Sequence, residues 1–248
     1  MIPLRDTNPR TTTPYVTWGL IGLNVLVFLM EFALGPSGMR EVVAYFGLIP
    51  LRAFHPQAYL QALIEYQPMG GELVVSLPPV YLPFLTSMFL HAGWWHVGGN
   101  MLYLWIFGDN VEDALGHVPF LLFYLVCGVG ASLAHCWITF AFQPHGALTT
   151  VVGASGAVAG VLGAYIYLFP RSRVLTLVPI FLFLQLMELP AQVVLGLWFL
   201  MQFFNGFLSL GRWAGGGVAF WAHVGGFLLG LLLATVLPKR RRPRMIYL

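Results

Sequence analysis

The sequence predicts an all-α membrane protein, a bundle of six transmembrane helices with a long folded first outer loop. Three observations predict this class. Hydrophobic residues make up 58% of the 248 residues and charged residues only 8%, whereas soluble domains carry about 25% charged residues. The charges fall in islands, and the apolar runs between the islands reach the ~20 residues that a helix needs to cross a bilayer. Proline and glycine then divide the longest runs into single spans.

The same composition excludes several classes of protein. So few charges cannot cover a water-facing surface, which disfavours a soluble enzyme, a disordered tail and a disulfide scaffold. The 12 basic and 9 acidic residues give a net charge of +3. This charge is too sparse for a nucleic-acid-binding face, so no nucleic-acid partner is expected. Cys127 and Cys136 lie in one apolar run and are interpreted as small buried side chains.

The predicted transmembrane helices cover 15–34, 94–114, 118–141, 151–169, 190–210 and 218–237. The first contains one acidic residue, Glu31, and its apolar stretch is longer than the ~7–15 residues of a secretory signal. The second begins in the uncharged stretch 73–108 and ends beyond it, with Asp109, Glu112 and Asp113 at its cytoplasmic end, and the third and fourth fall within 114–170, which contains no Asp, Glu, Lys or Arg. The last two fall within the uncharged stretches 189–211 and 213–238.

The segment 35–93 is too long to be a simple turn, because loops beyond ~12–15 residues are usually functional or disordered. Its apolar residues argue against disorder, among them Phe46, Ile49, Tyr59 and Leu63. We therefore expect a folded outer lobe that dips into the edge of the bilayer. The whole chain, 1–248, is interpreted as a single membrane domain.

The basic residues predict the orientation of the bundle. Six spans place both termini on one side, and the positive-inside rule selects that side. With a cytoplasmic N-terminus, 9 basic residues lie inside and 3 lie outside. The inside set is Arg5, Arg10, Arg171, Arg173, Lys239, Arg240, Arg241, Arg242 and Arg244, and the outside set is Arg40, Arg52 and Arg212. We thus expect cytoplasmic termini, a basic cytoplasmic tail at 239–248, and a bacterial cytoplasmic (inner) membrane.

Three polar clusters interrupt the apolar spans. They are His96-Val97-Gly98-Gly99-Asn100, Gly153-Ala154-Ser155-Gly156 and Ala222-His223-Val224-Gly225-Gly226. Intramembrane polar groups cost free energy, so each is a functional hypothesis. The second, fourth and sixth spans run inward from outside. Ser155 and His223 then lie about 6 and 8 Å below the predicted helix starts, in the outer third of the bilayer with His96 and Asn100.

Small residues at helical spacing predict that the fourth and sixth spans touch. Ala159 and Gly163 follow Ser155 on one helix face, and Gly226 and Gly230 follow His223 on another. Such stripes let membrane helices approach closely, although they are common in membrane bundles of every kind. Together with the matching depths they predict a hydrogen bond between Ser155 and His223.

This pair suggests acyl-transfer chemistry. A serine hydroxyl is a poor nucleophile unless a base takes its proton, and a neutral imidazole can take it. The fourth and sixth spans contain no carboxylate, so a Ser–His dyad is predicted rather than a triad. The backbone amide of Ser155, in a first helical turn, lacks an intrahelical acceptor. This amide, with the side chains of His96 and Asn100, is a candidate donor set for an oxyanion.

The three motifs together resemble the rhomboid family of intramembrane serine proteases, over about 89–230. The resemblance implies that Ser155 is the nucleophile, that His223 is the general base, and that His96, Asn100 and the Ser155 amide form the oxyanion hole. It implies single-span transmembrane proteins as substrates, cleaved near the outer membrane surface without a cofactor. His91 matches a histidine that supports the first loop. Gly153, Gly226 and Gly230 are assigned structural support.

One position departs from the family pattern. Some rhomboids carry a tyrosine four residues after the serine, packed against the histidine, and here that residue is Ala159. The group that orients His223 is therefore unidentified, with Tyr165 or Trp221 as aromatic candidates. The zinc-protease pattern His-Glu-x-x-His is missing from the sequence, and no metal site is expected.

The leading hypothesis is a serine endopeptidase whose partners are single-span transmembrane proteins and membrane lipid. Two alternatives stay open. One is a catalytically inactive rhomboid-like protein that binds membrane helices, and the other, less favoured, is a transporter. The oligomeric state, the natural substrate and the cleavage site are not predicted.

Overall fold

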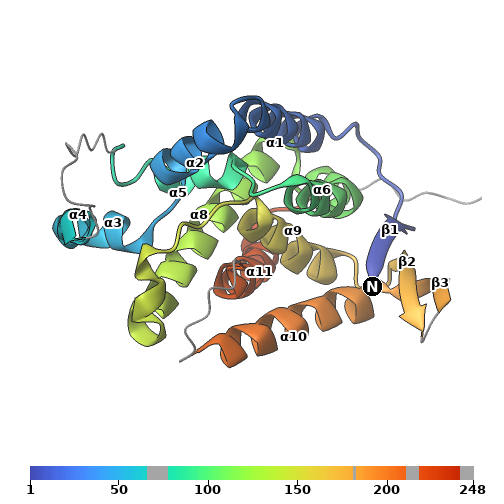
Figure 1. The fold of residues 1–248 in the computed structure, drawn as a ribbon. Helices are drawn as coiled ribbons and strands as arrows, with labels where there is room; N and C mark the ends of the chain where they lie inside the picture. The colour runs from blue at the N-terminus through green and yellow to red at the C-terminus, as the bar shows by residue number, and fades with distance from the viewer. Residues whose placement is uncertain (66–77, 181–182, 211–217, 241–248) are drawn as a thin grey trace, which may run out of the picture.

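The computed structural model describes residues 1–65, 78–180, 183–210 and 218–240, and most of them are helical (Figure 1). Helices form close to each predicted span. They are α1 (Tyr15–Ala33), the consecutive helical elements α6 (Trp94–Tyr103), η2 (Leu104–Gly108) and α7 (Asp109–Leu115), then α8 (His117–Phe142), α9 (Ser155–Leu168), α10 (Ala191–Ser209) and α11 (Phe220–Val236). Among the described residues, α1, α8 and α10 are long and apolar enough to cross a membrane, and α9 and α11 are shorter apolar helices.

The described parts of the segment 35–93 fold into short helices. These are α2 (Gly35–Phe46), α3 (Pro50–Phe54), α4 (Pro56–Glu65), α5 (Pro83–Thr86) and η1 (Ser87–Phe89), and a further short helix, η3 (Pro144–Leu148), follows α8. Leu48 and Val151 exchange two backbone hydrogen bonds of 3.0 and 2.7 Å. The N–H of Gly153 donates to the carbonyl of Ser87 (2.8 Å). The segment is thereby fixed to the chain immediately before α9.

A three-stranded antiparallel sheet corrects the all-α prediction. Strand β2 (Arg173–Ile180) lies between β1 (Ile2–Asp6) and β3 (Phe183–Pro190). The run that forms β2 and β3 is apolar on both faces, so it lacks the polar alternation by which a strand is recognised. The pairing of β1 with β2 joins segments that are far apart in the sequence, which no local pattern reveals.

The start predicted for the fourth span is also wrong. Helix α9 begins at Ser155, four residues later than 151, because Val151 pairs with Leu48 and Gly153 has a φ of +123° that no helix accommodates. Ser155 is therefore the first residue of its helix rather than the fifth. His223 lies three residues after the start of α11.

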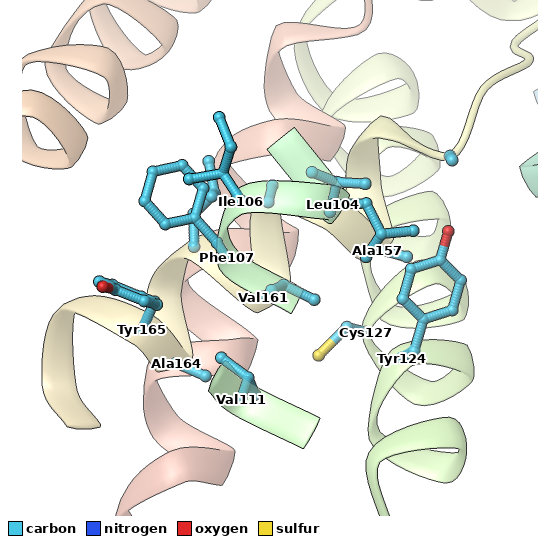
Figure 2. Close-up of a cluster of buried hydrophobic side chains, with 14 of the residues drawn as sticks. Leu104, Ile106, Phe107, Val111, Tyr124, Cys127, Ala157, Val161, Ala164 and Tyr165 are labelled. Carbon is cyan, nitrogen blue, oxygen red and sulfur yellow. The ribbon is translucent and has the colours of Figure 1, made fainter. Parts of the chain in front are cut away.

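The core is built around α9, whose middle is fully buried. Figure 2 shows side chains of η2, α7 and α8 converging on it, including Phe107, Val111 and Tyr124, beside Tyr165 of α9 itself. Against α11 the contact is backbone on backbone. A Cβ placed on Gly226 would lie 2.1 Å from the carbonyl oxygen of Gly156, and one on Gly230 would lie 2.0 Å from that of Gly160. Only glycine permits these two helices to lie so close.

Both ends of the described chain contact the end of the bundle opposite Ser155. The N–H of Arg240 donates to the carbonyl of Ala114 at the end of α7 (2.8 Å). Asp6 in β1 contacts Tyr165 in the last turn of α9. Of the tail at 239–248 and the lobe at 35–93, residues 241–248 and 66–77 lie outside the described residues, as does Arg212.

Candidate active site

Ser155 and His223 meet where α9 and α11 begin. Nε2 of His223 lies 2.8 Å from Oγ of Ser155, a normal hydrogen-bond distance. The imidazole is largely buried. The close glycine contact described above lies immediately below the pair, so the separation of the two side chains is set by two backbones that cannot approach further.

Gln202 on α10 holds the other nitrogen of the imidazole. Its Oε1 lies 2.7 Å from Nδ1 of His223. Because Oε1 only accepts hydrogen bonds, Nδ1 donates its proton to it, and Nε2 is left as the acceptor for the Ser155 hydroxyl. The indole of Trp198 packs near the same imidazole, with ring centroids 5.8 Å apart. Sequence reasoning missed Gln202, although an amide inside an uncharged span was a usable signal.

Neither aromatic candidate for orienting His223 takes that role among the recorded contacts. Tyr165 lies at the opposite end of α9, where its hydroxyl donates to Oδ2 of Asp6 (2.5 Å). The Trp221 ring packs against Phe203, with centroids 6.0 Å apart. The contacts to His223 come instead from α10, a helix to which the sequence analysis gave no site residue.

His96 lies beside Ser155. A Cβ placed on Gly153 would lie 2.6 Å from Nε2 of His96 and 3.7 Å from Oγ of Ser155. The side chains of His96 and Ser155 therefore both lie next to Gly153. The N–H of Ala92 donates to Nδ1 of His96 (3.3 Å). An imidazole that accepts at Nδ1 carries its proton on Nε2 when neutral, and Nε2 is therefore a donor on the side of Ser155. Gly153 leaves room for this ring.

Asn100 is positioned from the next turn of α6. Its side-chain amide donates to the carbonyl oxygen of His96 (3.0 Å), and the residue is buried. One of its two N–H groups is thus used to fix the side chain. The structure places Asn100 one helical turn below His96 without recording a contact to Ser155.

His91 lies behind His96 rather than in the site. The two rings form an edge contact with centroids 5.0 Å apart, and the backbone N–H of His91 donates to Oε2 of Glu31 in α1 (3.2 Å). Burial lowers the pKa of His91 to about 4, so it packs as a neutral ring. These contacts agree with a supporting position for His91 between α1 and His96.

A small cavity borders Ser155. It has a volume of about 20 Å³ and is lined mainly by small residues, with Ser87 and Ser132 as polar side chains. This space is close to that required by one water molecule. Ser155 therefore borders a water-sized space inside the bundle.

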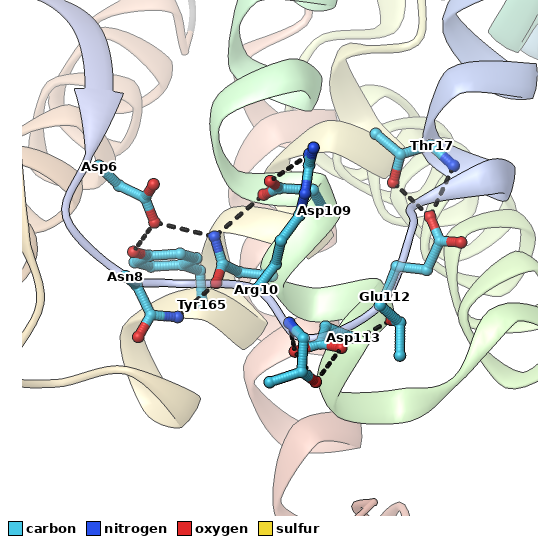
Figure 3. Close-up of polar contacts among 11 residues, drawn as sticks. Asp6, Asn8, Arg10, Thr17, Asp109, Glu112, Asp113 and Tyr165 are labelled. Atoms are coloured by element: carbon cyan, nitrogen blue, oxygen red, sulfur yellow. Dashed lines mark hydrogen bonds and ion pairs between the residues drawn. The ribbon is translucent and has the colours of Figure 1, made fainter. Parts of the chain in front are cut away.

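A second polar cluster occupies the opposite end of the bundle (Figure 3). Oε2 of Glu112 accepts hydrogen bonds from the N–H and hydroxyl of Thr17 (2.7 and 2.6 Å), and Oε1 accepts from the N–H of Val16 (3.0 Å). Glu112 thereby caps the first turn of α1, whose N–H groups lack intrahelical partners. Nδ1 of His117 lies 2.5 Å from the same carboxylate.

The segment that precedes α1 is fixed to this cluster. Asp113 accepts from the N–H of Thr11 (3.0 Å) and from the hydroxyl of Thr12 (2.6 Å). Asp6 accepts from the amide of Asn110 (3.0 Å) as well as from Tyr165. Burial raises the pKa of Asp6 to about 6, although the hydrogen bond from Tyr165 acts in the opposite direction. This cluster lies far from the dyad and shares α9 with it.

Among the residues that the structure describes, no three His, Cys, Asp or Glu side chains are grouped so that they could hold a metal ion. The geometry around Ser155 brings together a hydroxyl, an imidazole whose Nε2 lies within hydrogen-bond distance of it, and the side chain of His96. Those groups suit acyl transfer.

Comparison with known proteins identifies a Rhomboid domain over residues 79–240. Rhomboid protein 1, mitochondrial, of Saccharomyces cerevisiae is 31% identical over 218 residues, which cover 82% of this chain and 54% of that protein. Rhomboid protease GluP of Bacillus subtilis is 32% identical, covering 64% and 26%. Presenilin-associated rhomboid-like protein, mitochondrial, of Homo sapiens is 28% identical, covering 66% and 36%. The chain thus spans about half of the yeast relative and less of the other two.

Proposed function

The chain belongs to the rhomboid family, and from this premise we propose that it is an intramembrane serine endopeptidase. It uses a Ser155–His223 dyad to cleave transmembrane substrate proteins near the outer membrane surface. The observation that carries the proposal is the 2.8 Å contact between Oγ of Ser155 and Nε2 of His223. The family includes a relative that is named a protease, in Bacillus subtilis.

The proposed first step is attack of Oγ of Ser155 on the scissile carbonyl carbon. Nε2 of His223 takes the hydroxyl proton and later gives it to the leaving amine. Gln202 supports this step by accepting from Nδ1, which keeps Nε2 as the base. As the imidazole becomes charged, the Gln202 dipole stabilises it in place of the missing carboxylate.

Three donors are proposed for the oxyanion. The backbone N–H of Ser155 is free of an intrahelical acceptor and lies at the positive end of the α9 dipole. Nε2–H of His96 faces the same side of Gly153 as the nucleophile. The second N–H of Asn100 completes the set. A water in the cavity beside Ser155 would be suitably placed to hydrolyse the acyl-enzyme.

The proposal includes the membrane arrangement. We infer one domain, 1–248, with six spans, an outer lobe at 35–93 and cytoplasmic termini. The contacts of Asp6 and Arg240 at one end of the bundle support an even number of spans. The substrates are single-span transmembrane proteins, and the membrane is a bacterial inner membrane. The relative from Bacillus subtilis supports a bacterial membrane, whereas two of the compared relatives are named as mitochondrial.

The test is cleavage of a reporter transmembrane substrate by purified protein in proteoliposomes. Ser155→Ala removes the nucleophile and should abolish cleavage. Thr139→Val removes another buried hydroxyl, on α8, and should retain it. Persistent cleavage by pure Ser155→Ala would overturn the assignment, because no other described hydroxyl contacts His223. A folded but inactive wild-type protein would favour the helix-binding alternative.

A further inference from the structure

The sheet at the end of the bundle opposite Ser155 has one face that the protein does not cover. In an antiparallel sheet, directly paired residues point to the same face and neighbours along a strand alternate. On β1 and β2 one face carries Val174 and Thr176, which are completely buried, and Pro3, which is also buried, whereas Met187 and Phe183 on the same face of β3 are exposed. The other face therefore points away from the bundle.

The outward face is graded from charged to apolar. Its first row, nearest the helices, pairs Arg173 with Pro190, and the second pairs Arg5 with Leu175 and Leu175 with Glu188. The next row pairs Ile2 with Leu177 and Leu177 with Leu186. Beyond it Pro179 pairs with Leu184.

The apolar rows are strongly exposed. Leu184 is 67% exposed, Leu186 62% and Ile2 50%. Soluble proteins rarely display contiguous apolar patches of this kind without a partner, and edge strands usually carry charges that prevent association. Strand β3 has a single charged residue, Glu188, close to its end at the helices.

The position of the sheet identifies the partner. The N–H of Ala191 donates to the carbonyl of Ser172 (2.9 Å), which closes the base of the hairpin between α9 and α10. Val193 and Leu197, in the first two turns of α10, are each 43% exposed. They belong to the apolar outer surface of a candidate membrane span. The sheet therefore lies next to the N-terminal end of α10 (Figure 1), the end that carries these exposed apolar residues.

We propose that the outward face of the β1–β2–β3 sheet is a membrane-interface anchor that binds lipid. Leu184, Leu186 and Ile2 lie at the boundary between headgroups and acyl chains, in the leaflet opposite the active-site end. An amphipathic element with one apolar face and cations at its polar end binds at this depth. Arg5 and the exposed Arg171 at the base are placed to contact lipid phosphates. The anchor is independent of the proposed proteolysis.

The experiment measures the depth of the sheet in the intact protein. Leu184→Cys is made in a background in which the two buried cysteines, Cys127 and Cys136, are replaced by alanine. It is labelled with an environment-sensitive fluorophore and reconstituted in nanodiscs of phosphatidylcholine and phosphatidylglycerol. Quenching by a nitroxide on the upper acyl chain is compared with quenching by aqueous iodide. Leu197→Cys provides the lipid reference and Thr7→Cys, exposed at the base of the sheet, the aqueous reference.

If the sheet is a membrane anchor, the nitroxide lipid should quench the fluorophore at position 184 at least half as strongly as the fluorophore at position 197. It also predicts severalfold weaker iodide quenching than at position 7. Iodide quenching equal to that at position 7, without lipid quenching, would overturn the proposal. Protection from both quenchers, with cross-linking of position 184 between two copies, would overturn it in favour of self-association.

Discussion

The two ends of α9 hold their polar groups in different ways. At the Ser155 end a single chain of contacts runs from the serine through His223 to Gln202, beside small residues and a water-sized cavity. At the Tyr165 end, Asp6 accepts two hydrogen bonds and belongs to a dense cluster that fixes the N-terminal segment. Under the proposed function, the groups at the Ser155 end of the helix take part in the reaction, and those at the Tyr165 end stabilise the fold. Substitutions at the two ends should therefore separate activity from unfolding.

The largest expected effect is on the cleavage rate and comes from replacing His223, the proposed general base. His223→Gln retains a polar side chain of similar size but cannot take the serine proton, so cleavage should fall by about 10⁴-fold. The thermal unfolding midpoint in detergent should change little. His55→Gln, at an exposed histidine, is the matched control and should leave both quantities unchanged. Activity within tenfold of wild type would contradict the assignment of the base.

The next effect comes from the helix contact that fixes the dyad. In Gly226→Ala the added Cβ would meet the carbonyl oxygen of Gly156 at 2.1 Å, so α11 must move away from α9. A displacement of about 1 Å can cost 10²-fold in rate, and overpacking costs about 1–3 kcal/mol of stability. Gly196→Ala on α10 is the control, because a Cβ there meets nothing within 4 Å. Equal behaviour of the two variants would refute the close-contact account.

A smaller effect is expected at Gln202. Gln202→Leu leaves Nδ1 of His223 without its acceptor, and kcat should fall by about 10- to 100-fold, as for other groups that orient a functional histidine. KM should stay constant because Gln202 does not touch the substrate. Gln202→Glu keeps an acceptor and should recover most of the loss. Asn205→Leu, at an exposed amide on the same helix, is the control, and an equal loss there would indicate a purely structural effect.

At the Tyr165 end of α9, substitutions are expected to lower the stability of the protein and to leave its cleavage rate unchanged. Glu112→Gln weakens the charge-assisted cap on α1, and hydrogen bonds to charged groups contribute about 1.5–3 kcal/mol. The free energy of unfolding should fall by that amount, while the cleavage rate of the folded protein stays constant. Glu41→Gln, at an exposed position on α2, serves as the comparison. Loss of activity without loss of stability would contradict the division between the two ends.

The smallest effect concerns pH. Burial raises the pKa of Asp6 from 3.8 to about 6 in the folded protein, so between these values the folded state binds more protons than the unfolded state. Stability therefore falls as the pH rises through this window. Asp6→Asn should remove that slope and make the unfolding midpoint flatter between pH 4 and 6. An unchanged slope would show that Asp6 is not the titrating group.

The sequence predicted the elements that depend on local composition. Uncharged apolar runs located the helices within a few residues, and glycine spacing on 151–169 and 218–237 predicted which two would touch. It did not reveal that α9 starts at Ser155, because the pairing of Val151 with Leu48 is a long-range contact. The pairing of β1 with β2 was missed for the same reason, and the β2–β3 hairpin was missed because its run is apolar on both faces. Gln202 was missed because its role depends on how α10 packs beside α11, which periodicity within one helix does not specify.

The most direct measurement asks whether Ser155 is an activated nucleophile. A fluorophosphonate probe is attacked by Oγ, which forms a phosphorus–oxygen bond and releases fluoride, and mass spectrometry of the purified protein then locates the adduct. The account predicts labelling at Ser155 in the wild type and its loss in His223→Gln. An unlabelled Ser155 in correctly folded protein, or equal labelling without the imidazole, would contradict it.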